Sequence, residues 1–295
     1  MTTILLTGKT GQVGHELLRA LAPLGKLIAP DRTQMDLTDA DSIRRVIRDA
    51  RPDVIVNAAG FTIVDQAETQ PGLAMQLNGM APGIIAETAK RIGALLIHYS
   101  TTFVFDGHKR EPYTENDAPQ PINAYGRSKL AGEQAIIDCG GDYVILRANW
   151  VYSARRNNFA LTILKLAREK KELAIVDDQV GSPTWARAYA ETTAELVRQA
   201  GRVREHGGIY HLSASDYCTR FQWANKLIET AQALSGEHTG WARLRPTTTA
   251  EYPLPAARPL NTVTNNDKIR TLLGIQMLPW NEQLEAFLLD LAPAR

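Results

Sequence analysis

The chain has 295 residues, of which 44% are hydrophobic and 22% charged, and its net charge is +1. This balance gives no bulk attraction to nucleic acid or to an anionic membrane, so we expect neither as a partner. The two cysteines, Cys139 and Cys218, fit neither a disulfide framework nor a zinc site and indicate reduced thiols in a cytoplasmic protein. No apolar run reaches the about 20 residues of a membrane helix, and we expect no signal peptide.

The chain opens with a predicted strand, turn and helix. An apolar run at 3–7 is followed by glycines at every third position, Gly8, Gly11 and Gly14, and then by a helical pattern of leucines. Glycines let a backbone approach a pyrophosphate closely, and a helix N-terminus supplies N–H donors. The context therefore predicts a dinucleotide-binding turn rather than an ordinary strand-to-helix connection.

The end of the next predicted strand, 27–29, bears on the choice of cofactor. Asp31 would accept hydrogen bonds from ribose hydroxyls and favour NAD, whereas Arg32 would pair with the 2′-phosphate of NADP. Both are present, so the cofactor is NADPH or NADH. Asp36 and Leu37 lie where the adenine end is expected, although residues 36–39 also suit a helix cap.

Two further buried strands end in residues that suit a ligand site. Residues 52–60 end in Ala58, Ala59 and Gly60, which leave room for a ligand at the sheet edge. After a loop at 61–66 and a helix at 74–91, the strand at 95–101 ends in the hydroxyls of Thr101 and Thr102. These would bind a substrate oxygen or cap a turn. His98, inside the apolar run, is predicted to be a core residue.

A polar, proline-rich loop at 108–124 leads to Tyr125 and Lys129 on a predicted helix. Residues four apart lie on one helix face, and an ammonium beside a phenol would lower the phenol's pKa. Such a tyrosine could exchange a proton with an alcohol or carbonyl oxygen near neutral pH. On its own the spacing is a weak signal, because a surface helix with an extended lysine has the same pattern.

Strands and helices alternate up to a strand at 143–147, which predicts an α/β fold with a doubly wound parallel sheet of the Rossmann type. We expect residues 1–150 to form the dinucleotide-binding domain. Residues 151–295 should form mainly a smaller substrate lobe, with some segments returning to the main sheet. Its expected elements are helices at 157–168, 186–200, 220–234 and 281–291, a strand at 208–212 and an irregular loop at 246–259.

The glycine turn, the strand ending at Thr101 and the Tyr125/Lys129 pair together resemble the extended short-chain dehydrogenase/reductases. Later motifs narrow the resemblance to the dTDP-4-dehydrorhamnose reductase family, nearly end to end. They are Leu146–Tyr152, Asp177–Thr184 (Asp-Asp-Gln-Val-Gly-Ser-Pro-Thr) and Tyr252–Pro259 (Tyr-Pro-Leu-Pro-Ala-Ala-Arg-Pro).

The resemblance implies an enzyme that reduces the 4-keto group of dTDP-4-dehydro-6-deoxy-L-mannose to dTDP-L-rhamnose with NADPH or NADH. It implies that Tyr125 donates the proton, that Lys129 holds the nicotinamide ribose, and that Thr101 binds the keto oxygen. Trp150 would pack against the sugar. The implied cofactor residues are Gly11, Gln12 and Val13 at the pyrophosphate, Asp31 at the ribose, Asp36 and Leu37 at adenine, and Ala58, Ala59 and Gly60 along the channel.

Several positions depart from the family pattern and bear on the identity of the sugar. Thr102 and Phe103 replace an Asp-Tyr pair, Phe61 replaces Tyr or His, and Gln66 replaces Lys. A reductase of another dTDP-4-keto-6-deoxysugar therefore stays open. So does a non-catalytic regulatory subunit resembling the methionine adenosyltransferase beta subunit.

The same resemblance bears on assembly and on metal. We expect a monomer or homodimer. Some family members bind magnesium at a dimer interface through glutamates. Glu16 fits one of these glutamates, but Arg187 places a cation where another is needed, so we predict no metal site.

Overall fold

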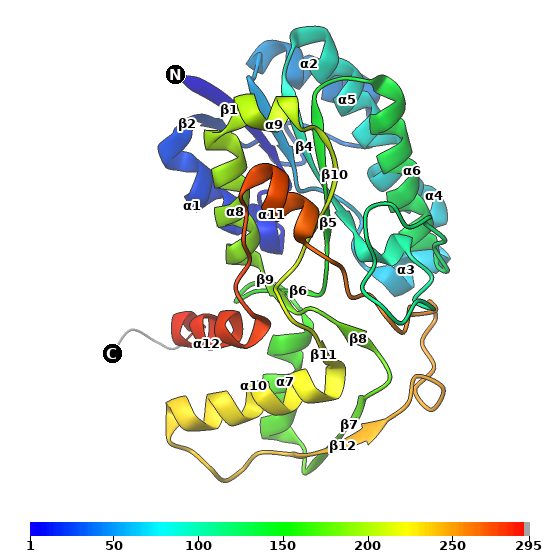
Figure 1. Cartoon of the computed structure of the whole chain (residues 1–295), viewed down its shortest axis with the longest axis vertical. Helices are drawn as coiled ribbons and strands as arrows, with labels where there is room; N and C mark the ends of the chain where they lie inside the picture. The colour runs from blue at the N-terminus through cyan, green and yellow to red at the C-terminus, as the bar shows by residue number, and fades with distance from the viewer. Residues whose placement is uncertain (292–295) are drawn as a thin grey trace.

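The computed structural model describes residues 1–291, and it is built around a six-stranded parallel sheet in the order β10-β5-β4-β3-β1-β2 (Figure 1). All strands but β10 come from the first 150 residues. The strands are β1 (Thr2–Thr7), β2 (Gly25–Ile28), β3 (Val54–Asn57), β4 (Leu95–Thr101), β5 (Tyr143–Ala148) and β10 (Gly208–Leu212).

Helices cover both faces of this sheet, so alternate residues of each strand enter different cores (Figure 1). Ile4, Leu6 and Val56 face one helical layer, whereas Leu5 and Ile55 face the other. The first layer contains α1 (Gln12–Leu21), α8 (Ala186–Arg198), α9 (Ala200–Glu205) and α11 (Asp267–Leu273); the second contains α2 (Ala40–Ala50), α5 (Ala81–Ile92) and α6 (Ala124–Cys139).

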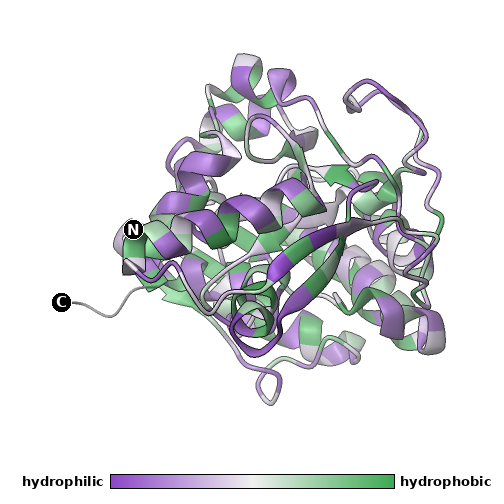
Figure 2. Cartoon of the chain, turned by 90° about the horizontal axis from the view of Figure 1, so that it is seen from below, coloured by the Kyte–Doolittle hydropathy of each residue, from purple (hydrophilic) through white to green (hydrophobic). Residues whose placement is uncertain are grey.

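A separate apolar cluster lies in the lower part of Figure 1, beyond the carboxyl ends of the strands. Its helices are α7 (Phe159–Glu169), α10 (Arg220–Ser235) and α12 (Trp280–Leu291). Seen from this side, they carry both hydrophilic and hydrophobic residues (Figure 2), as expected for helices that bury one face. Short strand pairs complete the lobe: β7 (Glu172–Val176) with β12 (Arg243–Thr247), β8 (Val180–Gly181) with β11 (Cys218–Thr219), and β6 (Val151–Tyr152) with β9 (Thr184–Trp185).

The doubly wound α/β fold is confirmed, and the differences from prediction are local. The prediction of a loop at 61–66 is wrong for its last three residues, because α3 (Val64–Thr69) begins at Val64. The expected helix at 74–91 starts earlier and contains a π-helical turn, running as α4 (Pro71–Met75), η2 (Gln76–Met80) and α5. Part of the expected irregular loop at 246–259 belongs to β12, whose Pro246 lies opposite Ile175 of β7.

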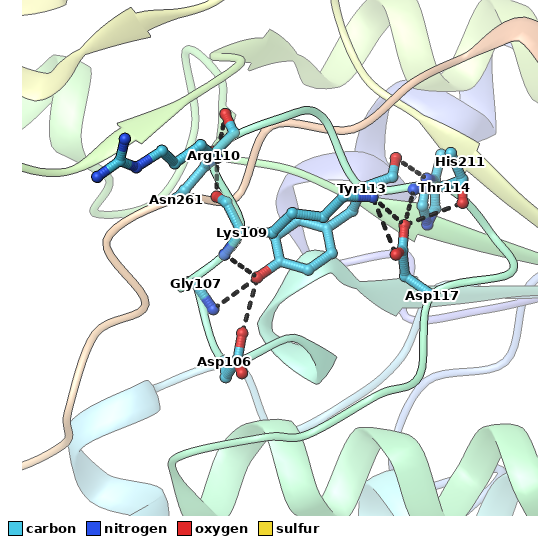
Figure 3. A network of polar contacts seen from close by, with 9 residues as sticks. All are labelled: Asp106, Gly107, Lys109, Arg110, Tyr113, Thr114, Asp117, His211 and Asn261. Carbon is cyan, nitrogen blue, oxygen red and sulfur yellow. Dashed lines mark hydrogen bonds and ion pairs between the residues drawn. The ribbon is translucent and has the colours of Figure 1, made fainter.

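The loop between β4 and α6 is held by a polar network around Tyr113 (Figure 3). The Tyr113 hydroxyl accepts hydrogen bonds from the Gly107 and Lys109 N–H groups and donates to Asp106 at 2.7 Å. Asp117 binds the Lys109 ammonium at 2.7 Å. The loop is therefore ordered, and it delivers the chain to α6 in a fixed position.

Candidate active site

Helix α6 carries Tyr125 and Lys129 in its first turns, and two contacts fix where it begins. The Asn123 side chain caps the helix by accepting the Gly126 N–H at 2.7 Å. A side chain at Gly126 could not fit, because its Cβ would lie 2.2 Å from the Phe103 carbonyl oxygen. The start of α6 therefore packs directly on the segment that follows Thr101, as the predicted proton-transfer site requires.

Lys129 is a buried cation whose nearest partners carry no charge. Its Nζ donates to the Tyr99 carbonyl at 2.5 Å and lies 3.4 Å from His98 Nε2, and its exposed fraction is 4%. Burial lowers the pKa of Lys129 to about 8, although Glu133 opposes the change. His98 has no exposed surface, as the apolar strand predicts, and its Nδ1 lies 2.9 Å from the Asn57 side-chain amide.

The carboxylate nearest to Lys129 along the helix is committed elsewhere. Glu133 forms an ion pair with Arg147 of β5 at 2.7 Å and accepts a hydrogen bond from Ser100 of β4. Both charged side chains of the pair are buried. The pair thus ties α6 to the sheet, and no carboxylate within residues 1–291 lies at ion-pair distance from Lys129.

The surroundings of Tyr125 contradict one part of the sequence analysis. The predicted lowering of its pKa by Lys129 is wrong in this structure: burial raises the pKa of Tyr125, and only the Thr101 hydroxyl opposes the rise. The Phe103 ring meets the Tyr125 ring edge-on, with 5.9 Å between centroids, and Phe61 packs in the same apolar cluster. One of the residues that depart from the family pattern therefore lies against the phenol ring, and a second packs in the same cluster.

The other predicted substrate residue of this segment, Thr102, is less open than expected. It has no exposed surface, and its buried hydroxyl has no hydrogen-bond partner among the described residues. Its neighbour Thr101 accepts the Phe103 N–H at 3.2 Å, so the two threonines also shape the turn after β4.

Asn78, which the sequence analysis missed, joins the ends of two elements at the site. Its amide accepts the Phe61 N–H at 2.8 Å and donates to the Phe61 carbonyl at 2.9 Å and to Ser128 Oγ at 3.0 Å. A Cβ at Gly60 would lie 2.8 Å from Asn78 Oδ1 and 4.0 Å from Lys129 Nζ. The predicted cofactor channel after β3 thus runs beside Lys129.

The glycine turn has the close packing that a dinucleotide needs. Gly8 has a φ of +79°, and a Cβ there would lie 2.6 Å from the Ala59 nitrogen and 2.7 Å from the Ala58 carbonyl carbon. A Cβ at Gly14 would lie 1.9 Å from the Gly8 carbonyl oxygen. Gly11 precedes α1 and offers no side-chain cap, so the N–H groups of the first turn are left for a ligand. Gln12 and Val13 belong to that turn.

The residues after β2 that were predicted to contact the adenosine end of the cofactor lie close together, and Lys9, which was not predicted, lies beside them. Asp31 Oδ1 accepts the Thr33 N–H at 3.0 Å, while Oδ2 lies 3.9 Å from the Lys9 ammonium. The hydrogen bond from the Thr33 side chain is the first cause that lowers the pKa of Asp31, and the Lys9 charge is a smaller one. Arg32 is exposed and helps to lower the pKa of Asp36, after the hydrogen bonds from Thr38. Leu37 packs on the core beneath.

A loop of the lobe lies over the glycine turn. The Arg156 Nε donates to the Thr10 carbonyl at 2.7 Å, and the Ser153 hydroxyl donates to Gln12 Oε1 at 3.1 Å. These contacts join residues more than 140 positions apart, and no local pattern indicates them. The predicted pyrophosphate site is thus bordered by both parts of the chain.

Trp150 is the predicted sugar contact, but other groups cover its ring. It has a φ of +30°, which is uncommon for a bulky residue, and its exposed fraction is 9%. A Cβ at Gly181 would lie 2.6 Å from the indole, and the Arg220 guanidinium carbon lies 3.6 Å from the ring centroid. A ligand approaching Trp150 would therefore meet Arg220 as well.

Arg187 lies between two carboxylates, away from Tyr125 and Lys129. Its guanidinium donates to Glu16 Oε2 at 3.1 Å and to Asp290 Oδ2 at 2.6 Å, which joins α1, α8 and α12. An organic cation thus lies between the two carboxylates. That no magnesium binds here stays a prediction.

Comparison with known proteins shows the family of the chain. A family model described as RmlD substrate binding domain matches residues 1–292. The dTDP-4-dehydrorhamnose reductase of Burkholderia thailandensis is 43% identical over 282 residues, covering 94% of this chain and 95% of the relative. The protein of the same name from Escherichia coli K12 is 41% identical, with 98% and 97% covered. The chain belongs to the dTDP-4-dehydrorhamnose reductase family.

Solved structures agree with this family membership. A crystal structure of dTDP-4-dehydrorhamnose reductase from Bacillus anthracis in complex with NADP superimposes with a TM-score of 0.89 at 32% identity, covering 98% of this chain and 99% of that one. The UDP-glucose 4-epimerase of Thermus thermophilus in complex with NAD gives 0.79 at 18% identity, which shows a shared fold only. No helix within residues 1–291 is long and apolar enough to span a membrane.

Proposed function

We propose that the protein reduces the 4-keto group of dTDP-4-dehydro-6-deoxy-L-mannose to give dTDP-L-rhamnose, with NADPH or NADH as the reductant. The observation that carries the proposal is the convergence of Tyr125, Lys129 and Thr101 at the carboxyl end of β4, beside the channel that leads from the glycine turn. Relatives covering nearly the whole chain carry the corresponding name.

We assign the cofactor to the part within residues 1–150 and the nucleotide-sugar mainly to residues 151–295. The glycine turn would hold the pyrophosphate, and Ala58 to Gly60 would line the channel toward Lys129. A Cβ at Gly8 would clash with the backbone of Ala58 and Ala59, and one at Gly14 with the Gly8 carbonyl oxygen, so both glycines allow the tight turn that a pyrophosphate-binding loop requires. When bound, the reduced nicotinamide supplies a hydride.

Tyr125 is suited to be a proton donor because its pKa is raised by burial, so the phenol is protonated at neutral pH. Negative charge develops on the keto oxygen as hydride reaches the carbonyl carbon. The Tyr125 O–H bond then breaks, its proton passes to that oxygen, and a hydroxyl results. Thr101, beside the phenol, would hold the oxygen in line. Lys129, whose ammonium donates to the Tyr99 carbonyl of β4, would hold the nicotinamide ribose hydroxyls.

The direct test is oxidation of NADPH and NADH, followed by absorbance, with enzymatically made dTDP-4-dehydrorhamnose and NMR identification of the product. We expect Tyr125→Phe to keep cofactor affinity but to lose about 100-fold or more in kcat, as for removal of a general acid. The matched control is Tyr252→Phe, which removes the hydroxyl of an exposed tyrosine and should leave kcat unchanged. Unchanged turnover in Tyr125→Phe would contradict the role of the phenol.

Phe103 and Phe61 keep a narrower question open within this proposal. They present apolar rings where the family pattern has hydroxyl-bearing side chains or histidine; Phe103 lies against the Tyr125 ring, and Phe61 packs in the same apolar cluster. Parallel assays with related dTDP-4-keto-6-deoxysugars would identify the preferred sugar. Cofactor binding with no turnover on any of them would favour a regulatory role instead.

A further inference from the structure

Arg220 is a half-buried arginine at the first position of α10, immediately after the Thr219 cap. Its guanidinium carbon lies 3.6 Å from the ring centroid of Trp150 and 5.0 Å from that of Phe159. Within residues 1–291 the guanidinium has neither a hydrogen bond nor a carboxylate at ion-pair distance. A half-buried guanidinium held by aromatic rings, with no ion pair among the described residues, keeps its N–H donors free for a ligand.

The charge around Arg220 is positive and uncompensated. Burial lowers the pKa of Arg220 to about 9, the positive charge of Arg258 lowers it further, and no carboxylate opposes them; the Cys218 thiol does so weakly. Arg258 itself is paired with Asp65 at 2.9 Å. The one carboxylate at ion-pair distance from these two guanidinium groups among the described residues thus belongs to Arg258, and the charge of Arg220 is uncompensated.

This charge borders the predicted active site on two sides. Trp150, beneath the guanidinium, lies two residues after Ala148, which pairs with Thr101 across β5 and β4. On the other side, the Asn123 cap of the Tyr125 helix donates to the Ala257 carbonyl at 2.8 Å, so the residue before Arg258 is tied to the start of α6. Arg220 is therefore connected through Trp150 to the strand end that carries Thr101, and through Arg258 to the start of α6.

We propose that Arg220 binds the diphosphate of the nucleotide-sugar, with its planar face fixed on Trp150 and its N–H groups directed at the phosphate oxygens. The inference rests on the proposed function for the class of substrate. A guanidinium offers paired donors that match two oxygens of a phosphate, and stacking on an indole leaves those edge donors free. An incoming diphosphate would also supply the missing negative charge. The strained backbone of Trp150 would then serve to hold the stacking surface in position.

The test measures binding of dTDP and of thymidine by calorimetry to the full-length protein saturated with NADP⁺. We expect Arg220→Met to weaken dTDP binding by about 10- to 100-fold, as for loss of hydrogen bonds to a charged group, and to leave thymidine binding within about twofold. Arg220→Lys should fall between, because a lysine keeps the charge but loses the planar fork. Arg243→Met, which removes an exposed arginine of β12 in the same lobe, is the matched control and should bind dTDP like the wild type.

Equal dTDP affinity in Arg220→Met and Arg243→Met would overturn the inference, as would an equal loss for dTDP and thymidine. Thermal melting identifies a variant that fails to fold. If Arg220→Met does not fold, dTDP binding is measured at several salt concentrations for Arg220→Lys and for the wild type. Because loss of a phosphate contact weakens the dependence of binding on salt, a smaller salt dependence in Arg220→Lys would support the inference and an equal one would overturn it. The outcome is separable from the proposed function: a protein that reduces no dTDP-keto-sugar but loses dTDP affinity in Arg220→Met would keep the diphosphate site and lose the reaction.

Discussion

Lys129 should make the stability of the cofactor-free protein depend on pH in an unusual direction. A lysine in the unfolded chain keeps its proton up to its ordinary pKa of 10.5, whereas burial lowers the pKa of Lys129 in the folded protein to about 8. Between these pH values the unfolded chain binds more protons than the folded one. Raising the pH through this window therefore stabilises the fold, whereas charging the buried ammonium below pH 8 destabilises it.

The size of the effect follows from the same two pKa values. At about 1.4 kcal/mol for each tenfold change in a proton equilibrium, a lowering from 10.5 to about 8 corresponds to about 3 kcal/mol. With an exposed fraction of 4%, the ammonium gains little from solvent screening. Its hydrogen bond to the Tyr99 carbonyl offsets part of the desolvation cost, which makes this figure an upper bound.

The assay is urea unfolding of the cofactor-free protein at several pH values from 7.5 to about 10.5, with Lys129→Met as the reference. Other groups titrate in this range, so the informative quantity is the difference in unfolding free energy between the two proteins. We expect Lys129→Met to be more stable at pH 7.5 and the difference to shrink as the pH rises. A constant difference across the range would refute a buried, charge-destabilised lysine.

Three further substitutions test other contacts. Glu133→Gln leaves its guanidinium partner buried without a counter-charge and should lower the unfolding free energy by about 3–5 kcal/mol in urea titrations; a loss below about 1 kcal/mol would contradict this. Gly14→Ala places a Cβ 1.9 Å from the Gly8 carbonyl oxygen, so NADPH affinity measured by fluorescence should fall at least about 10-fold, and an unchanged Kd would count against the turn as the cofactor site. Lys9→Ala removes the cation beside Asp31, so the Asp31 carboxylate would repel the 2′-phosphate that NADPH carries and NADH lacks. The Kd for NADPH should therefore rise more than that for NADH, and an equal change in both would contradict a role for Lys9 at the 2′ position.

The main sheet could be predicted because each of its strands is a short apolar run that ends in a turn. Residues 143–147 and 208–212 both have this pattern, and the structure pairs them as β5 and β10 although some 60 residues separate them. The pairing of β12 with β7 could not be predicted in the same way. Residues 243–247 contain two arginines and a proline, so their extended conformation depends on the neighbouring strand rather than on local preference.

The residues of the candidate site likewise include some that local patterns indicate and some that depend on distant contacts. The spacing of Tyr125 and Lys129 along one helix became informative only beside the glycine turn and the strand ending at Thr101, and the glycine turn could be recognised from its own residues. Asn78 lies in a π-helical turn inside an otherwise regular helix, and Arg220 begins a helix in the lobe. Their significance depends on contacts with residues 17 to 70 positions away, which no local pattern encodes.

The spacing of Tyr125 and Lys129 also shows where a local rule fails. An isolated helix would let the ammonium act on the phenol through its position alone, which predicts a lowered tyrosine pKa. In the folded protein both groups are removed from water, and desolvation shifts each toward its neutral form: the pKa of Tyr125 rises and that of Lys129 falls. A proton donor benefits from this outcome, because the phenol holds its proton until charge appears on the substrate oxygen. The protonated state of Tyr125 is therefore better attributed to burial, with the Phe103 ring packed against it, than to the helical spacing that first identifies the pair.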